Sequence, residues 1–451
     1  WREEVAEEGM RRFLFTVIIL VPFLYSASLT AQQAPVLLTL EQAVSMAMTN
    51  NEIYLSAKLD VGKANSRKRE AISEALPSLN LSSVYTRNWS LPELNFGGQI
   101  FRLGTDNSMN INLNFSQALY SGGKLRAGLK LASYFQEQTD ANLEVIRQNV
   151  TLAVHQAYYG VLLAQEVLDV NEASYGRSVA QLDQVNKFHG VGTVSLYDVL
   201  RAKVQVANSK PPVIQAKNRL AVSEARLKSL IGMDQTSLVI IAGDLLFQNT
   251  GPTSLASALR RAVQQRPDML AARLQTDMAD RNIAVVRSDG RLNVSLSAGY
   301  QMQAQVNDGQ VTGLGFNDFN RSLNTQLNVR FPIFDGRQNS SRVHQADADY
   351  ELARFNESRL KRQIEVDATE AYLNVQEAKE RMAAELVAVD LAERGLAIAQ
   401  VQYKSGMSTQ LEVIDAQLAL TQAQTNHVTA KHDYAVAVVT LQNVQGILGI
   451  E

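Results

Sequence analysis

The chain has 451 residues, 46% of them hydrophobic, and its 43 Lys+Arg against 45 Asp+Glu leave a formal net charge of -2. This length allows a large core or several domains, and the near-neutral charge gives no indication of a nucleic-acid partner. The chain contains no cysteine, which excludes thiol catalysis, disulfide bonds and thiolate metal sites within these residues.

The first predicted segment is an export signal within residues 1–31. After residues 1–9, which we interpret as upstream sequence, a basic start at Met10 is followed by the apolar run FLFTVIILVPFLY and by small residues up to a cleavage point after Ala31. The alternative is a single membrane-anchoring helix, but the run is short and Pro22 interrupts it. No later stretch has about 18 consecutive apolar residues, so a protein made of several membrane-spanning helices is excluded.

The remainder of the chain is an internal duplication. A shift of 214 residues (406 - 192) places Gly192 on Gly406, and it also places ALYSGG (118–123) on PIFDGR (332–337). Self-similarity over this distance predicts two structurally equivalent halves. The resulting segments are a first repeat at 32–232, an equatorial connector at 233–252 and a second repeat at 253–451.

Each half is predicted to contain the same series of elements. A helix, from Leu40 to about Ala75 in the first half, ends before Pro77 and is followed by two strands joined by a Gly/Asn-rich loop such as LNFGGQIFRLGTDN. A very long helix, a glycine turn and a returning helix follow. The predicted ranges are strands at about 77–120, a long helix at 121–187 and a return helix at 195–230 in the first half, and strands at about 291–334, a long helix at 335–404 and a return helix at 408–445 in the second.

The predicted strands have an unusual composition for a soluble sheet. Met109, Ile111 and Leu113 alternate with Asn110 and Asn112, so one face is apolar and the other carries uncharged polar side chains. Strands of about ten residues with this alternation and with aromatic ends are typical of a transmembrane barrel. The alternative is an ordinary antiparallel sheet with one buried face. Four strands cannot close a barrel, and lipid does not tolerate an open edge, so several chains must assemble.

The long helices favour a column over a compact core. Neither long-helix range contains a proline, and at roughly 1.5 Å per residue each helix is on the order of 100 Å long. Apolar residues such as Leu143, Ile146 and Val150 recur at the spacing of three and four that is typical of coiled-coil packing. Pro211 and Pro212 predict a kink in the first return helix that the second one lacks.

This series of elements resembles the TolC-type outer-membrane efflux channels. The resemblance is carried by the turns HGVGTVSLYDVLRAK (189–203) and KSGMSTQLEVIDAQ (404–417), by the corners ALYSGG and PIFDGR, and by the helix ends LIGM and ILGI, all in the same order in both halves. It implies an α+β membrane protein in the outer membrane of a Gram-negative bacterium. In such a homotrimer, three chains with four strands each form a twelve-stranded transmembrane β-barrel, which a long α-helical barrel continues into the periplasm.

The resemblance also implies a function and its partners. The chain would be the outer-membrane exit channel of a tripartite efflux or type I secretion system, conducting passively and gated at the periplasmic helical tip. Its partners would be a periplasmic adaptor (membrane fusion) protein, an inner-membrane transporter and outer-membrane lipid. The alternative from another class is a secreted coiled-coil structural protein or adhesin with a soluble β head.

The resemblance further implies the position of a gate. Asp415 and Glu412 match acidic positions that ring the constriction, and Tyr403 and Asp198 match the partners of a link that holds neighbouring helices closed. Three copies of an acid around one axis would attract cations and repel anions. The alternative is that both acids are solvated charges near a helix N-terminus, where carboxylates are favoured.

Two residues at the tip depart from the family pattern. Tyr197 stands beside Asp198 in place of a smaller polar residue, and Ser408 stands where related channels carry an arginine, so we expect a looser or rewired closing network. The residues expected to form the tip turns and to dock the adaptor are Gly190, Gly192, Ser195, Gly406, Ser408 and Thr409.

Enzyme signatures are missing from the sequence. The chain has no HExxH, GxSxG or GxxxxGK[ST] motif, and its five histidines are scattered. We therefore expect no catalytic residue, no cofactor and no metal site.

Overall fold

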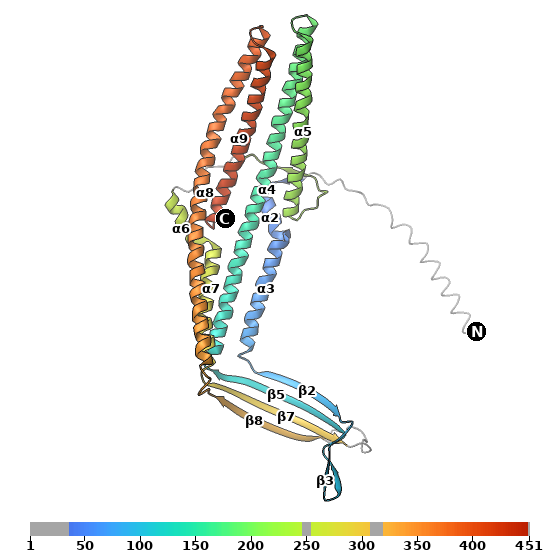
Figure 1. Ribbon diagram of the computed structural model, residues 1–451, viewed down its shortest axis with the longest axis vertical. Helices are drawn as coiled ribbons and strands as arrows, with labels where there is room; N and C mark the ends of the chain where they lie inside the picture. The colour runs from blue at the N-terminus through green and yellow to red at the C-terminus, as the bar shows by residue number, and fades with distance from the viewer. Residues whose placement is uncertain (1–35, 246–253, 307–318, 450–451) are drawn as a thin grey trace, which may run out of the picture.

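The computed structural model describes residues 36–245, 254–306 and 319–449. The molecule is elongated, with a β-sheet at one end and two helical hairpins that extend to the opposite end (Figure 1). The predicted export signal, the last part of the connector and most of the second strand-to-strand loop lie outside the described residues.

Four strands form one antiparallel sheet that contains strands of both halves of the chain. The strand order β2-β5-β7-β8 makes β5 and β7 the central strands, so the two halves are joined through the middle of the sheet. The strands are β2 (Ser78–Arg87), β5 (Asn107–Ser121), β7 (Asn293–Val306) and β8 (Asn320–Arg330).

The sheet has one apolar and one polar face. Successive cross-strand rows alternate in character, as the pleat requires. One row consists of Leu81, Leu113, Tyr300 and Leu323, and the next row, on the opposite face, consists of Asn80, Asn114, Gly299 and Asn324. Leu81 is 71% exposed and Leu323 is 73% exposed. An apolar face this exposed requires a cover that a single chain does not supply.

A small hairpin replaces the loop predicted between the first two strands. β3 (Glu93–Phe96) pairs with β4 (Gln99–Arg102), and the hairpin projects beyond the sheet (Figure 1). Gly97 and Gly98, at φ of 59° and 85°, supply the two left-handed residues that a tight two-residue turn needs. The prediction of a plain loop here is therefore wrong.

The helix that precedes each pair of strands is broken in two. The first half has α2 (Leu40–Asn50) and α3 (Glu52–Ser73), and the second half has α6 (Leu255–Gln265) and α7 (Pro267–Ser288). The prediction of one helix from Leu40 to about Ala75 is wrong, because Asn51 is extended and caps α3. Its side-chain oxygen accepts bonds from the backbone N–H groups of the next helix's first turn.

The long and returning helices have equal lengths in the two halves. α4 (Lys124–Gly190) and α8 (Gln338–Lys404) have 67 residues each, on the order of 100 Å. α5 (Leu196–Leu230) and α9 (Gln410–Val444) have 35 residues each. Both Pro211 and Pro212 lie inside α5, which stays helical on either side of them. The equal lengths confirm the two-repeat architecture.

The main hydrophobic core, which we call the waist, lies midway along the long helices. There β1 (Val36–Leu38) pairs in parallel with β6 (Val239–Ile241), beside α4. The hydroxyl of Tyr158 on α4 hydrogen-bonds to the carbonyls of Leu38 and Ala242, which fixes both strands to the helix. Buried residues of the waist include Leu38, Val154, Tyr158, Leu227, Ile231 and Val439.

Candidate functional site: the helical tip

Two turns at the end farthest from the sheet close the long helices with the same backbone motif. Gly192 and Gly406 have φ of 77° and 75°. In the second turn the N–H of Gly406 donates to the Tyr403 carbonyl (3.1 Å) and the N–H of Met407 donates to the Gln402 carbonyl (2.8 Å), and the first turn has the equivalent bonds. This is the Schellman motif, which requires a left-handed residue at the position of each glycine.

The acid of the first turn is used to cap a helix. The hydroxyl of Ser195 donates to the carboxylate of Asp198 (2.7 Å), and the backbone N–H of Asp198 donates to Ser195 Oγ (3.2 Å). The backbone N–H of Ser195 also donates to Asp198 (3.1 Å), which completes a capping box at the start of α5. Asp198 is thus bonded within its own turn.

Glu412 is also bonded within its own turn, but the side chain of Thr409, the N-cap residue of α9, accepts no capping hydrogen bond. The hydroxyls of Ser408 and Thr409 donate to its two carboxylate oxygens, at 2.8 Å and 3.3 Å. The bond from Ser408, the backbone of Thr409 and the hydroxyl of Thr409 lower the pKa of Glu412. Ser408 therefore fixes the carboxylate of Glu412 beside the N-terminus of α9, where a negative charge is favoured.

Asp415 differs from both of these acids. It lies one turn further into α9, is exposed, and has no hydrogen bond or ion pair to any other described residue. Arg201 occupies the equivalent position of α5 (201 + 214 = 415). The two turns therefore share a backbone motif but carry opposite charges one turn later.

Tyr403 is buried where the two hairpins meet. It packs among residues of α4, α5, α8 and α9, and its ring centroid lies 5.9 Å from that of Phe188. Burial, and then the charge of Asp198, raise the pKa of Tyr403. Its hydroxyl has no hydrogen-bond partner among the described residues, so Tyr403 and Asp198 are not bonded within one chain. A link between Tyr403 and Asp198 stays a prediction. Tyr197, which stands beside Asp198, has a side chain that is 70% exposed.

The tip also buries three glutamines that the sequence reasoning missed. Gln181, Gln410 and Gln417 are 7%, 4% and 4% exposed, and each has at least one side-chain atom without a partner among the described residues. A buried amide group without a partner costs about 1–3 kcal/mol. The signal was present in the sequence, because Gln410, Val413, Gln417 and Leu420 follow the three-four spacing of a core stripe.

The expected docking residues all lie in or beside the two turns. Gly190 ends α4, while Ser195 and Thr409 cap the returning helices. Apolar side chains also project from these turns. They were not among the predicted docking residues, although they stand directly beside the turn residues in the sequence. Val191, Leu196 and Met407 are 73%, 61% and 74% exposed.

Two other kinds of site are absent from the residues that the structure describes. No described helix has the length and apolar character needed to cross a bilayer. No group of three or more His, Asp or Glu residues is placed there to hold a metal ion.

Comparison with known proteins identifies relatives along the chain. The family described as "Outer membrane efflux protein" matches residues 43–233 and 258–446, one match in each half of the chain. The outer membrane protein TolC of Vibrio cholerae is 26% identical over 432 residues, covering 95% of each chain. The cobalt-zinc-cadmium resistance protein CzcC of Cupriavidus metallidurans is 23% identical over 400 residues, covering 87% of this chain and 90% of that one.

A solved structure has the same fold. The CmeC outer membrane channel of Campylobacter jejuni superposes with a TM-score of 0.77 at 19% sequence identity, covering 90% of this chain and 85% of that one. The fold of this chain thus occurs in an outer-membrane channel of known structure. The chain belongs to the outer membrane efflux protein family and is an outer-membrane exit channel of the kind used by efflux and type I secretion systems.

Proposed function

We propose that three copies of this chain form one channel that conducts passively, catalyses nothing, and is gated at the tip by Asp415. The sheet supports the trimer, because β2 and β8 are its two edges and the outer side of each pairs with no other described strand. An open edge in lipid leaves backbone groups without hydrogen bonds. Pairing β8 of one chain with β2 of the next closes a barrel and removes every edge.

The helical layer supports the same assembly. α3 and α5 form one lateral edge of the layer and α8 forms the other, with α4, α7 and α9 between them. Large apolar side chains are exposed on both edges. They include Leu59 (71%) and Val204 (57%) on the first edge and Leu352 (58%) and Leu391 (62%) on the second. Contact between neighbouring chains at these edges would bury both rows.

The observation that carries the gate is the contrast among three acids. Asp198 and Glu412 are bonded within their turns, whereas Asp415 is exposed and unpaired in the described structure. Threefold repetition of one unpaired carboxylate around a narrow axis concentrates negative potential there. The unpartnered glutamines nearby reduce the energy that holds the tip closed, which suits a part that must open.

The exposed turns supply a surface for partners. Val191, Leu196 and Met407 surround the two glycine turns and suit a periplasmic adaptor protein. Because the chain belongs to the outer membrane efflux protein family and the proposed channel conducts passively, we assign energy input to an inner-membrane transporter. The relatives include a protein named for alkaline protease secretion and one named for metal resistance, so the channel type does not fix the cargo.

The proposal is tested by conductance in planar bilayers. Asp415→Asn channels should lose cation selectivity, and block by multivalent cations from the periplasmic side should weaken roughly tenfold, because three charges leave the ring. Glu412→Gln is the matched control and should leave block nearly unchanged. Asp415→Asn channels with wild-type selectivity and block would show that the ring hypothesis is wrong.

Assembly is tested separately. Outer-membrane detergent extracts should contain a heat-modifiable trimer of the full chain. A soluble, extended monomer in the periplasmic or secreted fraction would contradict the channel and support a secreted coiled-coil protein.

A further inference from the structure

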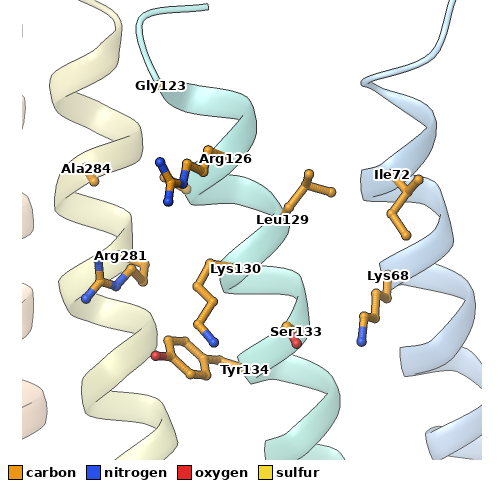
Figure 2. Close-up of a pocket in the computed structure, with 11 residues that line it drawn as sticks. Lys68, Ile72, Gly123, Arg126, Leu129, Lys130, Ser133, Tyr134, Arg281 and Ala284 are labelled. Carbon is orange, nitrogen blue, oxygen red and sulfur yellow. The ribbon is translucent and has the colours of Figure 1, made fainter.

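A cavity of about 760 Å³ opens between α3, α4 and α7, next to the start of α4. Figure 2 shows Gly123, where α4 begins, above the cavity, with Arg126 and Lys130 on α4 between Arg281 of α7 and Lys68 of α3. Its volume lies within the range of small-molecule sites.

The cavity has a strong excess of positive charge. Lys68, Arg126, Lys130 and Arg281 line it, and none of its lining residues is acidic. Arg281 is paired with the neighbouring Asp280 (3.0 Å). The other three have no acidic partner in the described structure.

The surroundings of those three leave their charges available. Lys68 donates to the neutral side chain of Gln136 (2.7 Å), and Lys130 lies over the ring of Tyr134, 4.4 Å from its centroid. Arg126 is exposed and has no hydrogen bond to another described residue. The site therefore presents charge-assisted donors to an anion.

The cavity lies on the side of the molecule that continues the apolar face of the sheet. A second pocket at the same junction is lined by Ser121, Asn293 and Arg330, which form one row on the polar face of the sheet, and by Lys124 of α4. At 3.6 residues per turn, Arg126 lies roughly 200° around α4 from Lys124. α4 therefore presents opposite faces to the two pockets, which supports a position for the cationic cavity on the outside of the proposed barrel.

The distance of the cavity from the end of the strands matches the position of a lipid headgroup. β5 ends at Ser121, and at about 1.5 Å per residue Arg126 and Lys130 lie roughly 5–15 Å beyond that end. The headgroup layer on one side of a bilayer is about 5–8 Å thick, and long basic side chains extend toward it. Ile72 and Leu129 add apolar surface to the lining for the glycerol and acyl carbons.

The next chain of a trimer does not cover this position. α4 is flanked by α3 and α7 of its own chain, and the cavity lies between these three helices, whereas the proposed contacts between chains fall on the far sides of α3 and α8. The cavity is thus open to the periplasmic leaflet rather than to a neighbouring copy.

The geometry points to a binding site for the phosphate of an anionic phospholipid, of the phosphatidylglycerol kind, in the periplasmic leaflet of the outer membrane. The site rests on the proposed barrel, because that barrel sets which face meets lipid. A bound headgroup would fix the height of the helical column relative to the membrane.

The experiment uses full-length trimer in nanodiscs of phosphatidylethanolamine, with and without phosphatidylglycerol, and counts retained lipids by native mass spectrometry. Wild type should retain phosphatidylglycerol selectively. Arg126→Gln/Lys130→Gln should bind it roughly thirtyfold more weakly, since two basic contacts are lost. Arg126→Lys/Lys130→Arg should keep binding, and Lys203→Gln/Lys210→Gln, which removes two exposed charges from α5, should match wild type.

Three results would overturn the site, each in a different way. Equal retention by wild type and Arg126→Gln/Lys130→Gln would show that these residues do not bind the lipid. The thermal stability of the trimer in phosphatidylethanolamine nanodiscs is also measured with added inorganic phosphate. If phosphate raises it as much as phosphatidylglycerol does, the occupant is a free anion. A heat-modifiable trimer that retains no phosphatidylglycerol would reject the site alone, whereas failure to form any trimer would reject the proposed function.

Discussion

The waist and the tip use the same glycine turn in opposite settings. Gly446 at the waist and Gly406 at the tip have φ of 72° and 75°, and both close a Schellman motif. A Cβ on Gly446 would lie 2.7 Å from the Gln265 carbonyl oxygen, while a Cβ on Gly406 would meet nothing within 4 Å. One backbone motif thus serves as a packed joint in one place and as a free turn in the other.

Polar groups show the same difference. At the waist the amide of Gln148 donates to the Gly446 carbonyl (3.1 Å), and the amide of Asn51 donates to the Leu230 carbonyl (2.9 Å). At the tip, Gln410 is buried with neither amide atom paired in the described structure. The paired amides of Gln148 and Asn51 thus add stability at the waist, whereas the amide of Gln410 adds none at the tip.

The largest expected effect tests the two glycines directly. Gly446→Ala should reduce the free energy of unfolding by about 3 kcal/mol, because the left-handed backbone and the overpacking both add to the cost. Gly406→Ala should cost about 1 kcal/mol, from the backbone alone. Thermal unfolding of the two variants measures this, and equal losses would remove the distinction between joint and free turn.

At acidic pH, protonation of His155 at the waist should lower the free energy of unfolding. Burial lowers the pKa of His155 to about 4, below its value of about 6.5 in an unfolded chain, so the unfolded state binds the proton more readily. Stability is full above pH 6.5 and falls as the pH drops toward 4, with a loss of about 2 kcal/mol at pH 5. His155→Gln should flatten this pH dependence in thermal unfolding, and an unchanged slope would show that other groups cause it.

A smaller effect compares equivalent tyrosines of the two repeats. Tyr158→Phe should cost about 1–2 kcal/mol, because the carbonyls of Leu38 and Ala242 lose a buried donor. Tyr372 occupies the equivalent place (158 + 214 = 372), but its hydroxyl only accepts from the exposed side chain of Gln376 (2.7 Å). Tyr372→Phe should therefore change the unfolding free energy by less than about 0.5 kcal/mol. Equal costs would mean that the hydroxyl of Tyr158 does not hold the strands.

The smallest effect on stability is expected at the tip. Tyr403→Phe removes a buried hydroxyl that has no partner in the described structure, so the unfolding free energy should change by less than about 0.5 kcal/mol. If the hydroxyl of Tyr403 bonds to a neighbouring helix in the trimer, Tyr403→Phe channels should open more readily than wild-type channels in planar bilayers, despite the small change in stability. Tyr403→Phe and Asp198→Ala channels that open no more readily than wild type would show that this link is not a lock.

The architecture could be predicted because it rests on strong, repeated signals. The long helices follow from extended stretches without proline, and the strands follow from alternation such as that of Ile111, Asn112 and Leu113. The helix breaks at Asn51 and Arg266 were missed. Asn51 is itself a capping residue, and Arg266 is followed by a proline at the first position of the next helix.

The candidate site was only partly predictable. The turn positions follow from the glycines, and Asp415 follows from comparing the two copies of the turn. The capping role of Asp198 and the bonds of Glu412 depend on local turn geometry, and the unpartnered state of Gln410 depends on which side chains the packed hairpins enclose. Periodicity indicates which face is buried, but it does not indicate which polar atoms find partners there.

The pairing of β1 with β6 has a consequence for the order of folding. Val36 lies opposite Val239, so the pair joins segments separated by 203 residues (239 - 36). Closing so long a loop is entropically unfavourable until α4 and α5 have formed and brought its ends together. The β1–β6 pair should thus be among the last contacts made, and its formation would report that the first half of the chain has folded.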